Sequence, residues 1–292
     1  MIVCPDCREP LELDSQGYVC GACDRVYPFR GGVPCFAEDA AHTSIEFREE
    51  YFKDLYDVES RHFWFYGRRE LIYRLVWKYY RDGMRTLELG SGAGNVVGYL
   101  NGCGMPFEGA DVFLKAIELA RTRVKTHFYQ LDMNKLPFRD EFHIIGIFDV
   151  LEHISDDTLV LRSINEALRD EGLLFITVPA RKKLWGRFDE VSCHKRRYER
   201  DELVALLQST GFRVLKASYY FFFLYPFYRL MRSLNRGKGR ELRDEVKIYP
   251  VINAVFRLVM FVEARIASVI NLPAGSSLVI VAVKTHAHRA EK

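Results

Sequence analysis

The sequence predicts an α/β protein in which a doubly wound parallel sheet carries helices on both faces and a small cysteine-rich module precedes the sheet. Three observations predict this architecture. Apolar runs alternate with helix-period segments between Thr86 and Pro179, a glycine-rich turn follows the first run, and two Cys-x-x-Cys pairs stand near the N-terminus. Such alternation is typical of βαβ units, which build parallel sheets.

The cysteine pairs predict a structural metal site. Cys4 and Cys7 are separated by 12 residues from Cys20 and Cys23. Four thiolates at this spacing suit tetrahedral zinc in a closed shell. The alternatives are two disulfides, or thiols without a ligand.

Composition places the chain among ordinary globular proteins. A length of 292 residues has room for one catalytic domain and a small module, and the net charge is only +3. The other cysteines (Cys35, Cys103 and Cys193) form no even disulfide pattern, and the start has neither a basic nor an apolar leader region. We therefore expect a reducing, cytoplasmic location.

The glycine-rich turn predicts a nucleotide-binding loop. Thr86–Leu89 indicates a buried strand, and Gly90, Gly92 and Gly94 then let the backbone approach a ligand beside a helix that begins at Asn95. The dinucleotide fingerprint places its third glycine three residues after the second, a position held here by Asn95. The loop is thus not of the dinucleotide type.

The next unit supplies an acid at the expected distance. Residues 105–111 indicate a second strand that ends at Asp111, and residues 113–123 indicate the following helix. An acid about 20 residues after the loop can accept hydrogen bonds from both hydroxyls of a ribose. The alternative is that Asp111 only caps the helix.

Three further strands follow in the same rhythm. Residues 127–131 form the third, after which Asp132 can accept from an adenine amino group. Residues 142–150 form the fourth, a helix covers 159–168, and residues 172–179 form the next strand.

In their order, these segments resemble the small-molecule branch of class I S-adenosylmethionine (SAM) methyltransferases, such as ubiquinone-biosynthesis O-methyltransferases and methyltransferases of cell-surface polysaccharide clusters. The resemblance covers residues 83–215 and implies a Rossmann-like class I methyltransferase sheet. It implies that the methionine part of the cofactor is held by Glu88, Gly90, Gly92 and Gly94, the ribose by Asp111 beside Val112, and the adenine by Asp132 and Met133. It also implies that Asp149 and residues 151–153 line the methyl-transfer end.

The cysteine-rich segment resembles the small zinc-ribbon proteins that bind and activate certain tRNA, rRNA and protein methyltransferases. The similarity runs from Tyr18 through Cys20 and Cys23 to the Gly-Gly-Val-Pro that ends at Pro34. An rRNA guanine methyltransferase family also carries a ribbon, commonly with histidine as fourth ligand, where this chain has Cys23. These resemblances divide the chain into a ribbon (1–36), a helical aromatic linker (37–82), a methyltransferase domain (83–285) and a polar tail (286–292).

The helical aromatic linker is expected either to act as a lid or to fill the interface between the ribbon and the sheet. Aromatic residues crowd it, and in similar methyltransferases this segment folds over the cofactor. Tyr66, Arg68 and Arg69 are the lid candidates, and Tyr66 is a candidate acceptor contact. Equally, the aromatic side chains could pack the ribbon against the sheet.

A basic stretch follows Pro179. Within it, the phrase from His194 to Tyr198 resembles the substrate-side loop of the same relatives and lies after the fifth strand, at the ligand-binding edge. Arg196, Arg197 and Tyr198 could clamp a phosphate- or carboxylate-bearing acceptor. The alternative is a solvated basic face.

An insertion at 217–272 precedes the closing strand at 278–284. Its first part is strongly aromatic and broken by Pro226, residues 229–247 indicate a loop, and residues 251–272 are apolar but hold charges that argue against a membrane span. It could roof an apolar acceptor pocket, rest on a membrane surface or form a homodimer interface.

Methyl transfer depends mostly on aligning the acceptor with the methyl carbon and sulfur, although a base can assist. His153 and His194 are the candidate bases, and Asp149 and Glu152 could hold the acceptor or a metal. We therefore expect a SAM-dependent methyltransferase that O-methylates a small or lipid-linked acceptor such as a sugar or quinone-like molecule. The alternatives are an RNA or protein methyltransferase that docks through its ribbon, with RNA the less favoured, and a non-catalytic SAM-binding scaffold.

Overall fold

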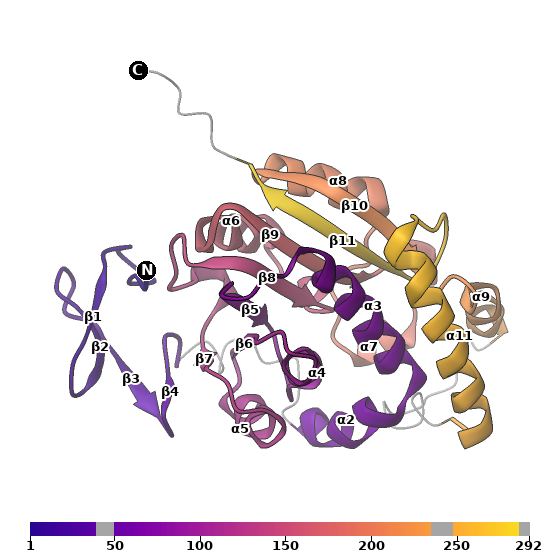
Figure 1. Cartoon of the computed structure of the whole chain (residues 1–292), viewed down its shortest axis with the longest axis horizontal. Helices are drawn as coiled ribbons and strands as arrows, with labels where there is room; N and C mark the ends of the chain where they lie inside the picture. The colour runs from indigo at the N-terminus through magenta and orange to yellow at the C-terminus, as the bar shows by residue number, and fades with distance from the viewer. Residues whose placement is uncertain (39–49, 235–247, 286–292) are drawn as a thin grey trace.

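The structure is a computed structural model that describes residues 1–38, 50–234 and 248–285. Figure 1 shows an α/β body with a small all-β module at one end. This arrangement confirms the fold class expected from the sequence. The polar tail and residues 39–49 of the linker lie outside the described residues.

The large sheet has seven strands in the order β10-β11-β9-β8-β5-β6-β7. In chain order they are β5 (Thr86–Leu89), β6 (Glu108–Asp111), β7 (Phe128–Gln130), β8 (Phe142–Phe148), β9 (Leu168–Pro179), β10 (Phe212–Tyr220) and β11 (Ser277–Lys284). β11 alone runs antiparallel to its neighbours. The chain moves outward from β5 to β7 and returns to pair β8 with β5, so the crevice for a ligand lies at the carboxyl ends of β5 and β8.

Helices cover both faces of this sheet because its strands are apolar on both sides. In chain order the helices are α2 (Glu50–Arg61), α3 (Phe63–Tyr79), α4 (Asn95–Gly102), α5 (Leu114–Arg123), α6 (Asp157–Ala167), α7 (Arg187–Val191), α8 (Arg200–Ser209), α9 (Tyr225–Leu234) and α11 (Pro250–Val269), with 3₁₀ turns η1 (Met133–Lys135), η2 (Leu151–His153) and η3 (Lys182–Leu184). Along β11, Leu278 and Ile280 join the core that includes α6 and α8, whereas Val279 and Val281 join the core of α3, α4, α5 and α11. Successive side chains of a strand point to opposite faces, which separates the two cores.

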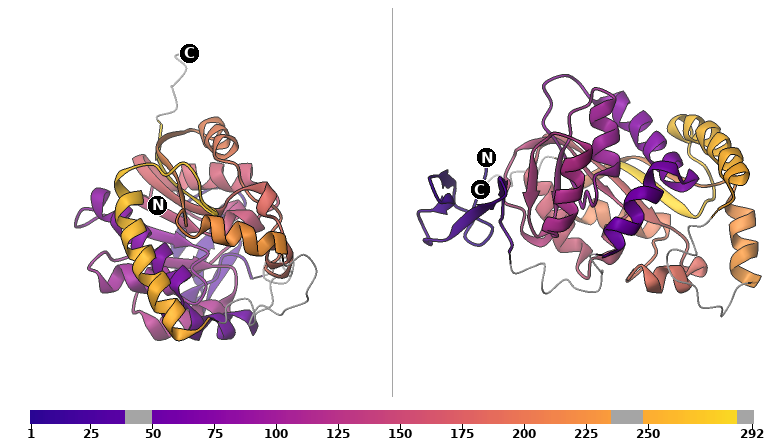
Figure 2. Two further views of the ribbon diagram at one scale, coloured as in Figure 1. Left: turned by 90° about the vertical axis from the view of Figure 1, so that its right-hand side faces the viewer. Right: turned by 90° about the horizontal axis from the view of Figure 1, so that it is seen from below.

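The insertion between β10 and β11 is helical where the structure describes it. α11 lies along α3 over much of its length (Figure 2), and a Cβ built on Gly67 of α3 would stand 2.8 Å from Cβ of Met260. The loop predicted at 229–247 is wrong for its first part, because α9 continues to Leu234. Pro226 ends the preceding aromatic run but is compatible with the first turn of a helix. Within the described residues, no helix has the length and apolarity needed to cross a membrane.

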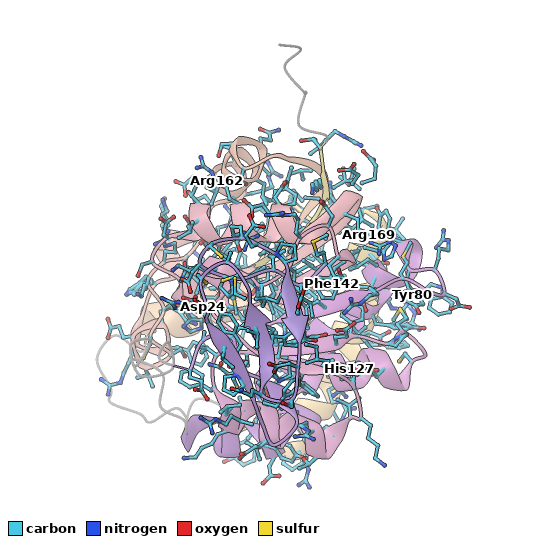
Figure 3. All side chains as sticks on the ribbon, turned by 90° about the vertical axis from the view of Figure 1, so that its left-hand side faces the viewer. Asp24, Tyr80, His127, Phe142, Arg162 and Arg169 are labelled. Carbon is cyan, nitrogen blue, oxygen red and sulfur yellow. The ribbon has the colours of Figure 1, made fainter. Side chains whose placement is uncertain are left out.

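The N-terminal module is a four-stranded antiparallel sheet. Its strands are β1 (Leu11–Leu13), β2 (Gly17–Cys20), β3 (Val26–Arg30) and β4 (Val33–Pro34). It docks on β7, the edge strand of the large sheet, where the amide of Phe36 donates to the carbonyl of Gln130 at 2.8 Å and the Gln130 side chain bonds both backbone groups of Ala37. Figure 3 views the molecule from this side.

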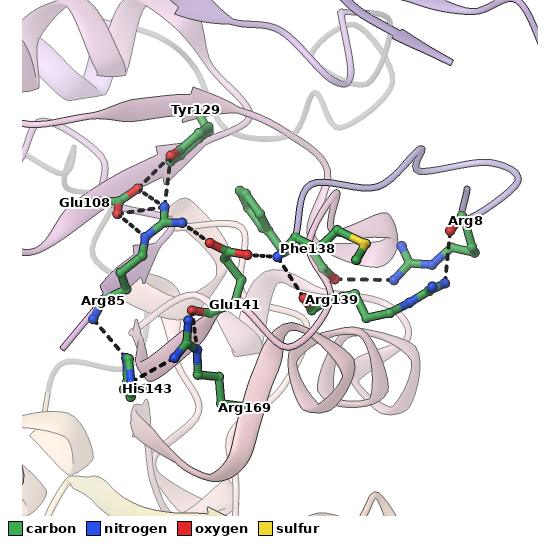
Figure 4. A network of polar contacts seen from close by, with 10 residues as sticks. Arg8, Arg85, Glu108, Tyr129, Phe138, Arg139, Glu141, His143 and Arg169 are labelled. Atoms are coloured by element: carbon green, nitrogen blue, oxygen red, sulfur yellow. Dashed lines mark hydrogen bonds and ion pairs between the residues drawn. The ribbon is translucent and has the colours of Figure 1, made fainter. Parts of the chain in front are cut away.

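A second contact joins the module to the amino ends of β5 and β8 (Figure 4). Arg85 pairs with Glu108 at 2.8 Å and with Glu141, and Glu141 also pairs with the amino group of Met1. A further hydrogen bond joins the module to the α/β body here, because Arg139 donates to the carbonyl of Arg8 at 2.9 Å. The module is thereby bonded to β7 at Gln130, the carboxyl end of this edge strand, and to the amino ends of β5 and β8.

Candidate active site

The glycine loop takes a conformation that requires glycine. Gly90, Gly92 and Gly94 have φ values of 69°, 52° and 81°, in the left-handed region. A Cβ on Gly90 would stand 2.5 Å from Val150, and one on Gly94 would stand 2.9 Å from Cβ of Ala120. The loop is therefore packed between β8 and α5, and it leads the chain into the N-terminus of α4.

Several buried polar atoms at this loop have no hydrogen-bond partner within the described residues. They are Oε2 of Glu88, Oγ of Ser91 and Oδ1 of Asn95. Burial raises the pKa of Glu88 to about 8, although the charge of Arg68 opposes the shift. Buried polar groups normally find partners, so these atoms fit a polar, partly cationic ligand such as the methionine part of SAM.

Asp111 connects the loop to the second strand. Its carboxylate accepts from the amide of Gly92 at 2.8 Å and from the amide of Phe113 at 3.0 Å. Burial raises the pKa of Asp111 to about 6. The bond to Phe113 is the capping role that the sequence offered as an alternative, yet each carboxylate oxygen keeps a second acceptor position for a ligand hydroxyl. Val112 follows at a partly exposed position.

Asp132 and Met133 stand at the end of β7. The Asp132 carboxylate accepts from the amide and the side chain of Asn134, at 2.9 and 2.8 Å. Met133 is buried, and its methyl carbon would contact a Cβ on Gly90 at 3.2 Å. Met133 therefore packs against the glycine loop, and Asp132 remains half-exposed beside it.

Asp149 is tied to α3. It has a φ of 55°, and its Oδ2 accepts from Arg68 at 2.7 Å and from Thr177 at 3.0 Å. The guanidinium of Arg68 also lies over the ring of Trp64, 4.9 Å from its centroid. α3 thus reaches the carboxyl end of β8 through one buried arginine.

Two segments that are distant in the sequence, around Glu152 and around His194, meet beside Asp149. Ligand atoms of Glu152, His153 and His194 all lie within 4.8 Å of one another. Neither carboxylate oxygen of Glu152 has a hydrogen-bond partner within the described chain, and burial, aided by the charge of Asp149, raises its pKa well above the usual value. Burial and neighbouring His194 lower the pKa of His153 to about 4.

His194 is oriented by a buried acid. Its Nδ1 lies 3.0 Å from Oδ1 of Asp189, and its Nε2 lies 3.9 Å from Oε1 of Glu152. Asp189 also pairs with Nε of Arg197 at 2.7 Å and accepts from the amide of Gly186. Asp189 is fully buried beside His194 and Arg197, and the sequence analysis did not select it as a site residue.

The basic residues expected to clamp the acceptor bond to this chain's own carboxylates. Arg197 is buried against Asp189, and Arg196 and the hydroxyl of Tyr198 reach Oδ2 of Asp157 at 2.6 and 2.9 Å. The guanidinium carbons of Arg69 and Arg257 lie 5.7 and 4.6 Å from the centroid of the Tyr66 ring. Acceptor contact by these residues remains a prediction.

Tyr220 was not among the predicted site residues. It is buried at the end of β10, and burial together with the charge of Asp149 raises its pKa well above the usual value. Its neighbour Phe221 stacks on Trp64 with ring centroids 5.8 Å apart. The sequence assigned this aromatic run to the insertion, and only the pairing of β10 with β11 brings it to the site.

The four cysteines converge at the other end of the molecule. The distances between Sγ atoms are 3.7 Å for Cys4–Cys23, 3.4 Å for Cys7–Cys20 and 3.7 Å for Cys7–Cys23. A tetrahedral Zn²⁺ with Zn–S bonds of about 2.3 Å separates its sulfurs by roughly 3.8 Å. All seven cysteines are free thiols, so the donor set and its geometry fit zinc.

The strand order, the single antiparallel strand and the glycine loop define a class I methyltransferase fold. A family model described as a methyltransferase domain matches residues 59–217, and one described as a Trm112p-like protein matches residues 1–32. The chain belongs to the methyltransferase-domain family and carries a Trm112p-like N-terminal segment. Its class is therefore that of SAM-dependent methyltransferases.

Individual relatives are more distant. The chain is 26% identical over 106 residues to a ubiquinone biosynthesis O-methyltransferase of Glaesserella parasuis, a match that covers 32% of this chain and 45% of that protein. It is 39% identical over 54 residues to a UPF0434 protein of Teredinibacter turnerae, covering 18% of this chain and 84% of that protein, and so is related to the UPF0434 family over this stretch.

A solved structure shares the fold. It is a complex between the Haloferax volcanii Trm112 methyltransferase activator and a methyltransferase, with a TM-score of 0.52 at 15% identity. The match covers 82% of this chain and 96% of that chain.

Proposed function

We propose that this chain transfers a methyl group from SAM to an oxygen of a small or lipid-linked acceptor, such as a sugar or quinone-like molecule. One observation carries the proposal: buried polar groups that have no hydrogen-bond partner among the described residues follow the carboxyl edge of the sheet from Glu88 to Glu152. Burying such groups without partners destabilises a fold, so their retention is what a polar ligand site requires.

We assign the cofactor to the β5–β7 half of this edge. The carboxylate of Glu88 would receive the ammonium group of the methionine part, and Gly90, Gly92 and Gly94 would admit it to the loop. The free acceptor positions of Asp111 would receive the ribose hydroxyls beside Val112. Asp132 and Met133 would contact the adenine.

We assign the acceptor to the β8–β9 half, near Asp149. When bound, SAM supplies an electrophilic methyl group. His194, with its Nδ1–H donated to Asp189, would present Nε2 to remove the proton of an acceptor hydroxyl. Glu152, protonated through its raised pKa, would donate a hydrogen bond to the acceptor. An oxygen acceptor suits this pair, because a hydroxyl must lose its proton during transfer.

We propose that Cys4, Cys7, Cys20 and Cys23 hold a structural zinc, in a reducing compartment that keeps these thiols free. The ribbon then stabilises the methyltransferase body within one chain. The Trm112p-like match also supports the second candidate, a protein or RNA acceptor docked by the ribbon. We favour the small acceptor, because Cys35 and Phe36 of the ribbon are already paired with β7 of this chain and the ordinary net charge of +3 does not favour RNA.

Calorimetry with the full chain, loaded with zinc, tests the cofactor site. We expect SAM and S-adenosylhomocysteine to bind wild-type protein, and Asp111→Ala to weaken binding at least about tenfold because a buried acceptor of hydrogen bonds is lost. Absence of binding to wild-type protein would reject the function.

Transfer of labelled methyl groups to fractionated cell extract tests the acceptor class. Label in small water-soluble molecules or in organic-soluble lipids supports the proposal, and label confined to RNA or protein favours the second candidate.

A further inference from the structure

The outer face of the insertion is apolar and exposed. Along α11, five aliphatic residues spaced by three, four or seven positions are between 45 and 76% exposed: Val251, Val255, Leu258, Val262 and Val269. Phe223, Phe227 and Leu230, in and before α9, are also exposed. α9 and α11 lie together on one side of the molecule (Figure 2, left). We call these eight residues the outer face.

α11 is held firmly with this face outward. Its opposite side buries Met260, Ala264 and Ala267 in the core shared with α3. Asn253 accepts from the amide of Phe63 at 2.8 Å and donates to the carbonyl of Arg61 at 2.9 Å. A helix that is apolar all round is normally buried on all sides or in contact with lipid, and large exposed apolar patches mark interaction sites.

The exposed charges of the two described segments that carry the outer face have one sign. Across residues 221–230 and 248–272, the ionisable acids and bases other than tyrosine are Arg229, Arg257, Glu263 and Arg265. Glu263 is buried and accepts from the amides of Phe222 and Phe223, at 2.9 and 3.0 Å. Arg229 and Arg265 are exposed, so every exposed charge in these ranges is positive.

The combination of exposed apolar side chains and exposed arginines favours an anionic membrane over a second copy of the chain as the partner of the outer face. A second copy of the chain would bring arginine against arginine with no exposed acid of these ranges to compensate. An anionic bilayer accepts the aliphatic and aromatic side chains at its acyl boundary while its headgroups pair with arginine. We propose that the outer face of α9 and α11 binds the surface of an anionic membrane.

A short series of contacting side chains runs from the outer face to the acceptor end of the site, near Asp149. Phe256 of α11 contacts Phe63 of α3, with ring centroids 5.1 Å apart. Trp64, the next residue of α3, stacks on Phe221 and lies under Arg68, which bonds Asp149. Docking by the outer face would thus bring a lipid-linked acceptor near Asp149, a consequence that rests on the proposed function, whereas membrane binding itself does not.

Co-sedimentation of the full zinc-loaded chain with lipid vesicles tests the proposal without any cofactor. We expect binding to vesicles of phosphatidylcholine mixed with phosphatidylglycerol, weaker binding to phosphatidylcholine alone, and a decrease with added salt. The double variant Leu258→Glu, Val262→Glu should lose at least about tenfold in vesicle affinity, because two carboxylates would face the headgroups and acyl chains.

Leu13→Glu is the matched control, since Leu13 on the ribbon is 63% exposed against 65% for Leu258. Circular dichroism should show that all variants fold. Wild-type protein that ignores both vesicles, or a double variant that binds as wild type does, overturns the proposal. A wild-type dimer in light scattering that the double variant converts to a monomer, without vesicle binding, would identify the face as a homodimer interface instead.

Discussion

Buried carboxyl groups determine how individual residues of the site respond to pH. Glu88 and Asp111 have pKa values raised to about 8 and about 6, and the pKa of Glu152 is raised well above its usual value, in each case chiefly by burial. In the sequence these are three acids among 39. Strongly shifted carboxyls gathered in one crevice are typical of a functional site.

The raised pKa of Glu88 predicts how the stability of the protein depends on pH. Its pKa is higher folded, about 8, than unfolded, 4.5, so the folded state binds the proton more tightly. The resulting stabilisation is full below pH 4.5, declines as pH rises and is lost above about 8. Glu88→Gln, a neutral isostere, should flatten the fall in Tm of cofactor-free protein across this window. Parallel Tm curves for wild type and variant would contradict this expectation.

We expect loss of the Asp189 charge to lower the free energy of unfolding strongly. Asp189→Asn would leave the buried guanidinium of Arg197 without its charge partner, so we expect a loss of about 3 kcal/mol in the free energy of unfolding. Asp201→Asn is the matched control, because its pair with Arg200 is exposed and should contribute less than about 1 kcal/mol. Urea unfolding measures the free energy of unfolding of both variants. Equal losses would contradict the prediction that the buried pair of Asp189 and Arg197 stabilises the fold more than the exposed pair.

At the scale of elements, α3 links the insertion to the site. One side of it contacts α11 through Gly67, and its Arg68 bonds Asp149 at the end of β8. The linker was expected either to act as a lid or to pack the ribbon against the sheet, whereas these contacts join α3 to the insertion and to the end of β8. Its role over a bound cofactor remains a prediction.

Two helical glycines make the close approach of α3 testable. In Gly67→Ala the new Cβ would stand 2.8 Å from Cβ of Met260, which cannot swing away, and we expect a loss of about 1–3 kcal/mol. In Gly98→Ala of α4 the nearest atoms are at 3.7 Å, an ordinary contact, so the better helix propensity of alanine should add up to about 1 kcal/mol. Thermal unfolding of both variants should therefore give shifts of opposite sign. Shifts of the same sign would refute the predicted crowding.

At the scale of the whole molecule, the ribbon covers the open edge of the large sheet. β7 would otherwise present an open edge, which proteins normally cover. The ribbon covers it through Cys35, Phe36 and Ala37, and the network around Arg85 and Glu141 adds a second attachment. Loss of the ribbon's structure should therefore break the hydrogen bonds between the ribbon and the methyltransferase body and expose the edge of β7.

Zinc removal tests this coupling. A strong chelator should unfold the ribbon, because a structural zinc supplies much of the folding energy of so small a module. Hydrogen exchange should then accelerate at the amides of Val3 and Phe36, which donate to Pro137 and Gln130. The amide of Ser91, bonded to Ala110 inside the body, should stay protected and serves as the control. Unchanged exchange at Val3 and Phe36 would exclude zinc-dependent docking.

Local patterns in the sequence were sufficient to predict the sheet, the glycine loop and the cysteine cluster. Strand periodicity, the spacing of Gly90, Gly92 and Gly94, and the spacing of the cysteine pairs all act over short distances along the chain, where steric and ligand geometry leave few alternatives. The last turns of α9 to Leu234 were missed, because Arg229 and Arg232 lead into a basic stretch with glycines, and the whole stretch resembles a loop in the sequence.

Only the tertiary structure decided which polar groups are buried and which apolar groups are exposed. Tyr220 reaches the site because β10 pairs with β11, and Arg197 became an internal partner because Asp189 is buried beside it. The apolar residues of 251–269 could equally have filled a core, but α3 accepts only one side of α11. Burial depends on contacts between residues distant in the chain, so periodicity along the chain cannot determine it.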